Sequence, residues 1–446
     1  MRFSAPEAFR SDTVVEGQVA ASRQAFLGHA VLYGVFSLLL LAPLAFGAVE
    51  PWSIFVLQAG AVTLFVLWAL QQAWSAEVQI AGNPLFAPML VFAALIALQL
   101  LPGLSAYRYI TFSTGLLYGS FGILSFLAVQ CVHRNRDVKA LAVVFSIYGF
   151  VVALFALLQS FTSRGKLYWI RTPRSGGWIY GPYVNHNHYA GLMELLLPVS
   201  LVVLFSGKVR GGPRILLGFA TVLMASTIFL SGSRGGMVAF AVQLALLATF
   251  LGTRGRNPRA ALALGVLVLA VGCALVWLGG SSLADRLSSI HSEARTELSG
   301  GVRLAINRDG LRMFFQKPVV GFGLGTFPIV YPRFRSFFTN MFVNEAHNDY
   351  LQLLVEMGMA GFATMLWFLW LLFRNGLPKL RDGPSSVNGG LALATLLGCT
   401  GILVHSFVDF NLQVPANAAL FYVFAALAAS APLPENHHRR RPPMMA

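Results

Sequence analysis

A histidine between two carboxylates, late in the chain, is the group whose type and position best suit acid–base chemistry. The run from Glu345 to Tyr350 (EAHNDY) ends a polar, arginine-bearing segment and leads directly into an apolar stretch. If a helix begins near Asn344–His347, its positive N-terminal end disfavours the protonated imidazole and leaves His347 able to accept a proton. The same helix end attracts anions. We therefore predict that a base and an anionic ligand meet here, and keep as an alternative a structural histidine bonded to a loop carbonyl.

Arginines supply the second candidate chemistry, because several lie in segments that we place on the outer face of a membrane, where positive charge is usually scarce. A guanidinium is always charged and its planar fork matches phosphate oxygens two at a time, so these arginines indicate a lipid-linked phosphate or diphosphate. We assign this role to Arg234 and Arg303. The alternatives are lipid-headgroup contact for Arg234 and an ion pair with Glu297 or Asp309 for Arg303. The other outer arginines are Arg164, Arg171, Arg174, Arg308, Arg312, Arg333 and Arg335, of which Arg308 and Arg312 are further substrate-binding candidates.

Further substrate contacts are expected from polar residues at two places. The run NHNHYAG at 185–191 offers Asn187 and His188 as a polar lining for a sugar or a phosphate, and Asn348 and Asp349 follow the candidate base. A zinc site would need more nitrogen, sulfur or carboxylate ligands than this neighbourhood supplies. We therefore expect no metal ion and no other cofactor.

Five titratable residues also stand out by their position. Glu345 and Asp349, four residues apart, can share one helix face, but carboxylates this close are more often solvated or paired with arginine. Glu194 falls inside an apolar stretch, where a carboxylate is costly, so we expect it to face the bundle interior and a cationic partner. His405 and Asp409 are also four residues apart, and we predict that they pair with each other.

The elements that must position these residues are membrane helices. The chain has 446 residues, of which 56% are hydrophobic and 11% charged, with a mean hydropathy of +0.67, whereas soluble domains are about a quarter charged. A span needs about 20 mostly apolar residues, and this criterion predicts an all-α, polytopic membrane protein with about twelve spans. The predicted spans are 26–48, 52–74, 85–101, 115–132, 138–161, 189–205, 215–230, 236–251, 260–278, 350–373, 391–407 and 414–427.

The distribution of lysine and arginine over the short loops predicts the orientation. With the N-terminus in the cytoplasm, five basic clusters fall on the cytoplasmic side, as the positive-inside rule requires. This placement explains most of the net charge of +15 through topology and contact with anionic lipids, without nucleic acid. The clusters are Arg134/Arg136/Lys139, Lys208/Arg210/Arg214, Arg254/Arg256/Arg259, Arg374/Lys379/Arg381 and Arg439–Arg441.

The same pattern divides the chain into five parts. We predict a cytoplasmic N-terminal segment at 1–25, helices 1–9 at 26–278, a long outer loop at 279–347, helices 10–12 at 348–430 and a basic cytoplasmic tail at 431–446. Within the outer loop, 303–315 places Leu304, Leu311, Phe314 and Phe315 on one helical side and cations on the other, which is typical of a helix lying in the membrane interface, with Pro318 as its stop.

A glycine-rich run in the outer loop is compatible with two interpretations. The segment Gly321–Thr326 (GFGLGT) lacks the spacing and the preceding strand of a nucleotide-binding loop. We interpret it as a turn in which the backbone approaches a neighbour or a ligand closely.

Four of these runs, in order, resemble the successive signatures of the O-antigen ligase and polymerase superfamily. They are NHNHYAG at 185–191, SGSRG at 231–235, Arg303 followed by PVVGFGLG at 318–325, and AHNDYL at 346–351, and the resemblance covers roughly 181–361. It implies a GT-C-like fold in the bacterial inner membrane and a metal-independent, inverting glycosyltransferase that takes a glycan from undecaprenyl diphosphate on the periplasmic face. It also implies that Arg234 and Arg303 hold the diphosphate and that His347 activates or orients the acceptor hydroxyl.

The resemblance leaves the acceptor open. A ligase passes the glycan to a sugar of lipid A-core, which we favour, and a polymerase passes it to another lipid-linked repeat, with the same donor and leaving group. Two other classes of protein are alternatives. A transporter of lipid-linked glycans usually has internal repeats and polar groups near the bilayer midplane, and a non-catalytic scaffold leaves the outer arginines unexplained.

Overall fold

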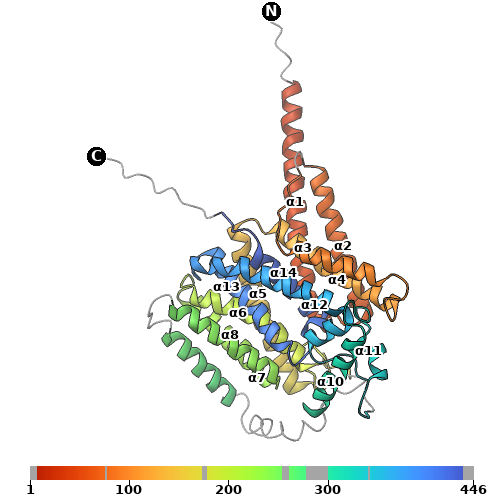
Figure 1. Cartoon of the computed structure of the whole chain (residues 1–446). Helices are drawn as coiled ribbons and strands as arrows, with labels where there is room; N and C mark the ends of the chain where they lie inside the picture. The colour runs from red at the N-terminus through yellow and green to blue at the C-terminus, as the bar shows by residue number, and fades with distance from the viewer. Residues whose placement is uncertain are drawn as a thin grey trace, which may run out of the picture.

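A computed structural model describes residues 8–75, 78–172, 178–253, 261–277, 300–339 and 342–434 (Figure 1). Within these ranges the regular elements are helices, and two isolated bridges, Leu167 with Arg171 and Tyr180 with Tyr183, are the extent of β pairing. The all-α prediction is therefore confirmed. The first part of the predicted outer loop with Glu297, the tail beyond residue 434, and the cations Arg174, Arg254, Arg256, Arg259 and Arg439–Arg441 lie outside the described residues.

Nine helices in the described ranges are long and apolar enough to cross a membrane. The chain is therefore a polytopic membrane protein. Three shorter apolar helices occupy the other predicted spans. The long helices are α1 (Ala8–Leu44, apolar from Phe26), α2 (Pro51–Ala73), α4 (Arg108–Cys131), α5 (Asn135–Thr162), α6 (His186–Phe205), α7 (Gly212–Leu230), α8 (Arg234–Thr253), α12 (Asp349–Gly376) and α13 (Val387–His405); the shorter ones are α3 (Phe86–Gln99), Ala261–Trp277 and α14 (Pro415–Ala429).

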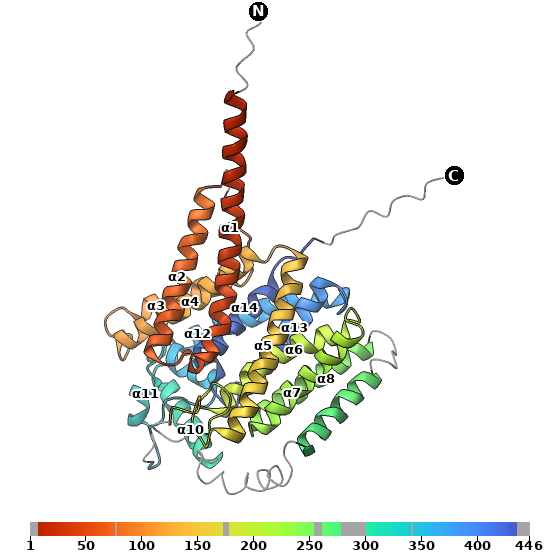
Figure 2. The same cartoon turned by 180° about the vertical axis from the view of Figure 1, so that it is seen from behind.

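Helices α6, α13 and α14 form the centre of the bundle. Every residue of α6 from His186 to Val202 is buried, which is the pattern of a helix surrounded by other helices rather than by lipid. Helices α1 to α4 lie on one side of this centre and α7 and α8 on the other (Figures 1 and 2). The polar residues at the start of α6 are therefore held by protein on all sides.

Three of the predicted basic loops meet at one end of the bundle, which we call the basic end. The Ser385 hydroxyl, before α13, donates to the Ser206 carbonyl at the end of α6 (2.8 Å), and Asn135 Nδ2, at the start of α5, donates to the Pro434 carbonyl (3.1 Å). The ammonium group of Lys379 donates to the carbonyls of Ala428 and Ser430 at the end of α14. This arrangement accords with the predicted grouping of the basic loops on one side.

The glycine-rich run packs its backbone against a kink in α12. Gly321 and Gly325 have positive φ, and a side chain on Gly321 would meet the backbone of Glu356. The Glu356 carboxylate accepts hydrogen bonds from the backbone N–H groups of Gly325 (2.8 Å) and Phe327 (3.1 Å), and α12 is kinked at Gly358 (φ 62°). The interpretation as a turn of close backbone approach is confirmed, and the neighbour is α12.

Helix α10 (Gly300–Gln316) ends before Pro318, as predicted, but its faces differ from the prediction. Ile306 and Met313 are fully buried in a small separate core, and Leu304 and Phe315 are exposed. Arg308, one turn from Leu304, lies on that exposed apolar side rather than opposite to it. The prediction of two faces was wrong because α10 has a third face that packs against the protein.

Candidate active site

Candidate residues gather at the end of the bundle away from the basic loops, around His405–Val414, which comprises the last residue of α13 and the segment that leads to α14. We call His405–Val414 the connector. Asp349, the first residue of α12, ties that helix to it: its backbone N–H donates to the Ser406 carbonyl (3.0 Å), and its carboxylate accepts from the Ser406 hydroxyl (2.7 Å) and the Leu412 N–H (3.1 Å). The end of α13 and the start of α12 are thereby fixed to one another.

His347 stands against this connector. Asn348 is the N-cap of α12, its side chain accepting from the Leu351 N–H, so His347 directly precedes the cap at the positive helix end. Its Nδ1 lies 3.7 Å from Asp409 Oδ1, an ion-pair separation, and its ring meets the Phe410 ring edge-on at 4.9 Å. The backbone of His347 is left-handed (φ 52°), a strained conformation that occurs at functional sites.

His188 approaches Phe410 from the other direction. Its ring lies 4.7 Å from the Phe410 ring, so this phenyl group is in edge-on contact with both histidines. His188 is buried, and its Nε2 has no hydrogen-bond partner among the described residues. Buried polar atoms usually have a hydrogen-bond partner, so this nitrogen is available to bond a ligand.

Asp409 is surrounded by imidazoles. Burial raises the pKa of its carboxyl group, but the facing His347 and the nearby His188 and His405 outweigh burial, so the pKa falls below its usual range. Asp409 is therefore a fixed negative charge at neutral pH, placed to stabilise a positively charged His347.

Glu194 and His405 form a second buried pair behind this group. His405 Nδ1 lies 2.7 Å from Glu194 Oε1, and both side chains are almost completely buried. Glu194 thus faces the interior, as predicted, and His405 is its partner. The predicted pairing of His405 with Asp409 is wrong, because α13 ends at His405 and the chain turns, bringing Asp409 to His347 instead.

Arg303 reaches the connector from α10. Its Nη1 donates to the Val408 carbonyl (3.1 Å), next to Asp409, and its buried Nε has no hydrogen-bond partner among the described residues. The alternative pairing with Asp309 is not what the structure shows, because Asp309 accepts from Ser336 and lies 3.5 Å from Arg312.

Helix α8, whose first residue is Arg234, begins beside the connector. The Ser233 hydroxyl accepts from the Gly236 N–H and caps the helix, which puts the exposed Arg234 at its positive end. A side chain on Gly235 would meet the His405 ring and Val408. The glycine therefore allows α8 to start against the connector, beside the residue that Arg303 binds.

The structure separates the other residues predicted to contact substrate into three groups. Asn187 is buried in the first turn of α6, beside His188. Arg308 and Arg312 follow Arg303 by five and nine residues, which points them to a different side of α10. Asn348 and Asp349 are engaged in the internal hydrogen bonds given above, which favours a role in positioning His347 over the predicted contact with substrate.

Two further predicted groups are held by protein partners. Glu345 accepts a hydrogen bond from Gln352, and burial, with the neighbouring Glu356, raises the pKa of the Glu345 carboxyl group to about 8. Arg171, predicted to lie in an outer loop, is paired with Glu50 at 2.5 Å. Neither residue faces the connector through these contacts.

An apolar groove leads away from the site. It has a volume of 580 Å³ and is lined mainly by α2, α3, α4, α12 and α14. It runs from Asp349 and the connector residue Gln413 to Phe86 and Phe126 toward the opposite end of the bundle. Leu90, which lines it, is 70% exposed, so the groove opens on the side of the bundle. This shape suits a long hydrocarbon chain whose polar end lies at the connector.

Sequence reasoning missed Phe410 as a site residue and misassigned Asp409. Their spacing gave a signal, since a carboxylate and an aromatic residue follow a histidine at the end of an apolar run. The partners of both residues lie in distant segments, which no local pattern reveals.

The comparison with protein families agrees with these observations. A family model described as O-antigen ligase matches residues 219–366, from within α7 to within α12. The match includes Arg234, Arg303 and His347, whereas His188 and Asp409 lie outside it. No curated protein matches the chain. This matched region, about a third of the chain, supports the resemblance of the membrane protein to the O-antigen ligase and polymerase superfamily.

Proposed function

We propose that this protein is an O-antigen ligase, which transfers a glycan from undecaprenyl diphosphate to a sugar hydroxyl of lipid A-core at the periplasmic face of the inner membrane. The observation that carries the proposal is that Arg303, His347 and the start of α8, which begins with Arg234, all meet one connector. The family match supports the reaction class. The groove beside the connector supports a donor with a long isoprenoid chain.

In the proposed reaction, His347 is the general base. It takes the proton of the acceptor hydroxyl as that oxygen attacks the anomeric carbon, and the bond from this carbon to the diphosphate oxygen breaks on the opposite face, which inverts the configuration. A base positioned in this way accelerates the reaction by a factor of about 10²–10⁴. Asp409, 3.7 Å away, stabilises the imidazolium that forms.

The two arginines act on the leaving group. Charge grows on the diphosphate as the glycosidic bond breaks, and guanidinium donors fixed beside it stabilise that charge. In comparable sites, each such donor contributes a factor of about 10²–10³ in kcat. Arg303 suits this role because its bond to the Val408 carbonyl fixes its direction while its Nε has no hydrogen-bond partner in the part of the chain that the structure describes. Arg234 is exposed at a helix end that itself favours anions.

The test is transfer by the purified protein in detergent, with undecaprenyl-diphosphate glycan and either lipid A-core or a second lipid-linked repeat as acceptor. We expect product on lipid A-core that is lost in Arg234→Ala and His347→Ala and kept in the control Arg333→Ala, an exposed arginine of the same outer segment. Growth of ladders on undecaprenyl diphosphate would replace the ligase with a polymerase. Binding of the donor without transfer to either acceptor would favour a transporter.

A further inference from the structure

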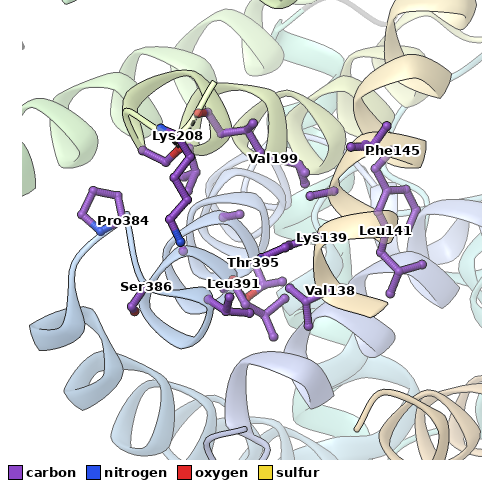
Figure 3. Close-up of a pocket in the computed structure, with 18 of the residues that line it drawn as sticks. Val138, Lys139, Leu141, Phe145, Val199, Lys208, Pro384, Ser386, Leu391 and Thr395 are labelled. Carbon is purple, nitrogen blue, oxygen red and sulfur yellow. Dashed lines mark hydrogen bonds between the residues drawn. The ribbon is translucent and has the colours of Figure 1, made fainter. Parts of the chain in front are cut away.

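A second cavity lies at the basic end, between α5, α6, α13 and α14 (Figure 3). It has a volume of 270 Å³, and its walls are almost entirely aliphatic or aromatic, with Val199, Leu391 and Phe145 among them. Val143, which lines it, is 55% exposed, so the cavity opens on the side of the bundle where lipid lies. We call it the basic-end cleft. It shares no lining residue with the groove beside the connector.

Two lysines and two serines stand at the mouth of the cleft. Lys139 comes from the start of α5 and Lys208 from the turn after α6, and Figure 3 shows Lys208 reaching toward α13. Ser385 and Ser386 come from the segment before α13. Positive charge and hydroxyl groups therefore surround the entrance to an apolar interior.

The charges of the two lysines are not neutralised by the protein in the ranges that the structure covers. The nearest acidic residue in sequence, Asp137, lies 3.5 Å from Arg136, and no described carboxylate forms an ion pair with Lys139 or Lys208. The Ser386 side chain caps α13, so the positive end of that helix also lies at the mouth. The mouth is thus complementary to an anion.

We propose that the basic-end cleft binds an anionic phospholipid, with its phosphate between Lys139 and Lys208 and one acyl chain in the apolar interior. The volume is slightly below the range of about 300–1,000 Å³ for pockets that enclose whole small ligands, which suits one chain segment rather than a complete lipid. A zwitterionic lipid offers the same chain but no net charge to the lysines. The bound lipid joins α5, α6 and α13, the last two of which carry the Glu194–His405 pair.

The proposal is tested by native mass spectrometry of the full chain with phosphatidylglycerol or phosphatidylcholine of identical acyl chains. We expect preferential retention of phosphatidylglycerol, weakened about tenfold in the double variant Lys139→Gln/Lys208→Gln. Arg214→Gln removes an exposed basic-end charge outside the cleft and serves as the matched control. Equal retention of the two lipids, or unchanged retention in the double variant, overturns the proposal.

Two further measurements test the acyl-chain part. Val203→Trp, at a half-buried wall position, is expected to fill the cleft and reduce phosphatidylglycerol retention without removing any charge. Inorganic phosphate alone is expected to leave the melting temperature unchanged, whereas phosphatidylglycerol raises it. Normal lipid retention in a folded Val203→Trp protein, or equal stabilisation by phosphate, would reject an acyl chain in this cleft.

Discussion

At the connector, Arg303 donates to a backbone carbonyl and His347 faces the buried Asp409, whereas at the basic end Lys139 and Lys208 stand exposed around an apolar cleft. Both ends are cationic. At the connector the charged groups are directed by fixed partners, and the buried Glu194–His405 pair lies behind them. Around the cleft at the basic end, the ammonium groups of Lys139 and Lys208 sit on flexible stems. The difference indicates that the first end suits chemistry on a substrate and the second suits attraction of a headgroup, because catalysis depends on preorganised groups.

The largest expected effect contrasts one histidine from each end. His347→Asn removes the base but keeps a residue that tolerates the left-handed backbone (φ 52°), so we expect kcat to fall about 10²–10⁴-fold in a protein that still folds. His29→Asn, an exposed histidine 3.5 Å from Arg136 at the basic end, is expected to leave kcat unchanged. The transfer assay measures both. Similar losses in the two variants would remove the distinction between the ends.

The next prediction concerns the shape of the cation. Arg303→Lys keeps the charge but loses the planar fork and the buried Nε, so we expect about a 10²-fold loss in kcat. Arg381→Lys makes the same exchange at the basic end and is expected to have no effect on turnover. If Arg303→Lys is fully active, charge alone suffices at the connector, as it does at the basic end.

Asp409→Asn tests the role of the buried carboxylate beside His347. The amide keeps the size of the side chain but removes the charge that faces His347, so we expect kcat to fall by about 10–100-fold while KM stays near its original value. A purely structural role predicts a different outcome, in which the melting temperature falls and both kinetic constants change together.

The same comparison shows which parts of the molecule were predictable from the sequence. Each predicted span overlaps an apolar helix, because a membrane span is encoded by a local run of apolar residues. The site residues themselves were also recognisable from local sequence, since His347 precedes a helix and Arg234 follows a serine-glycine turn. The partners were not, because the contact of Phe410 with His188 and His347 depends on how three distant segments pack.

Two local rules failed for identifiable reasons. The spacing of four residues between His405 and Asp409 implied a shared helix face, but the helix ends at His405 and the rule stops there. The prediction of two faces for α10 left out the third face, which packs into the small core around Ile306 and Met313. In both cases tertiary structure decided what the side chain meets.

The smallest expected effect concerns Glu345, next to the site, and its dependence on pH. Because its pKa is raised from 4.5 to about 8, the folded state holds this proton more tightly than the unfolded state between those two values. The contribution of Glu345 to stability is therefore constant below pH 4.5, falls as the pH rises toward 8 and is constant again above it. Glu345→Gln keeps a polar side chain near Gln352 and abolishes the titration, so the decline of the melting temperature from pH 5 to 8.5 is expected to be shallower. Asp382→Asn, at an exposed carboxyl group of the basic end, is expected to leave the decline unchanged; an equal flattening in this control would assign the effect to general surface charge.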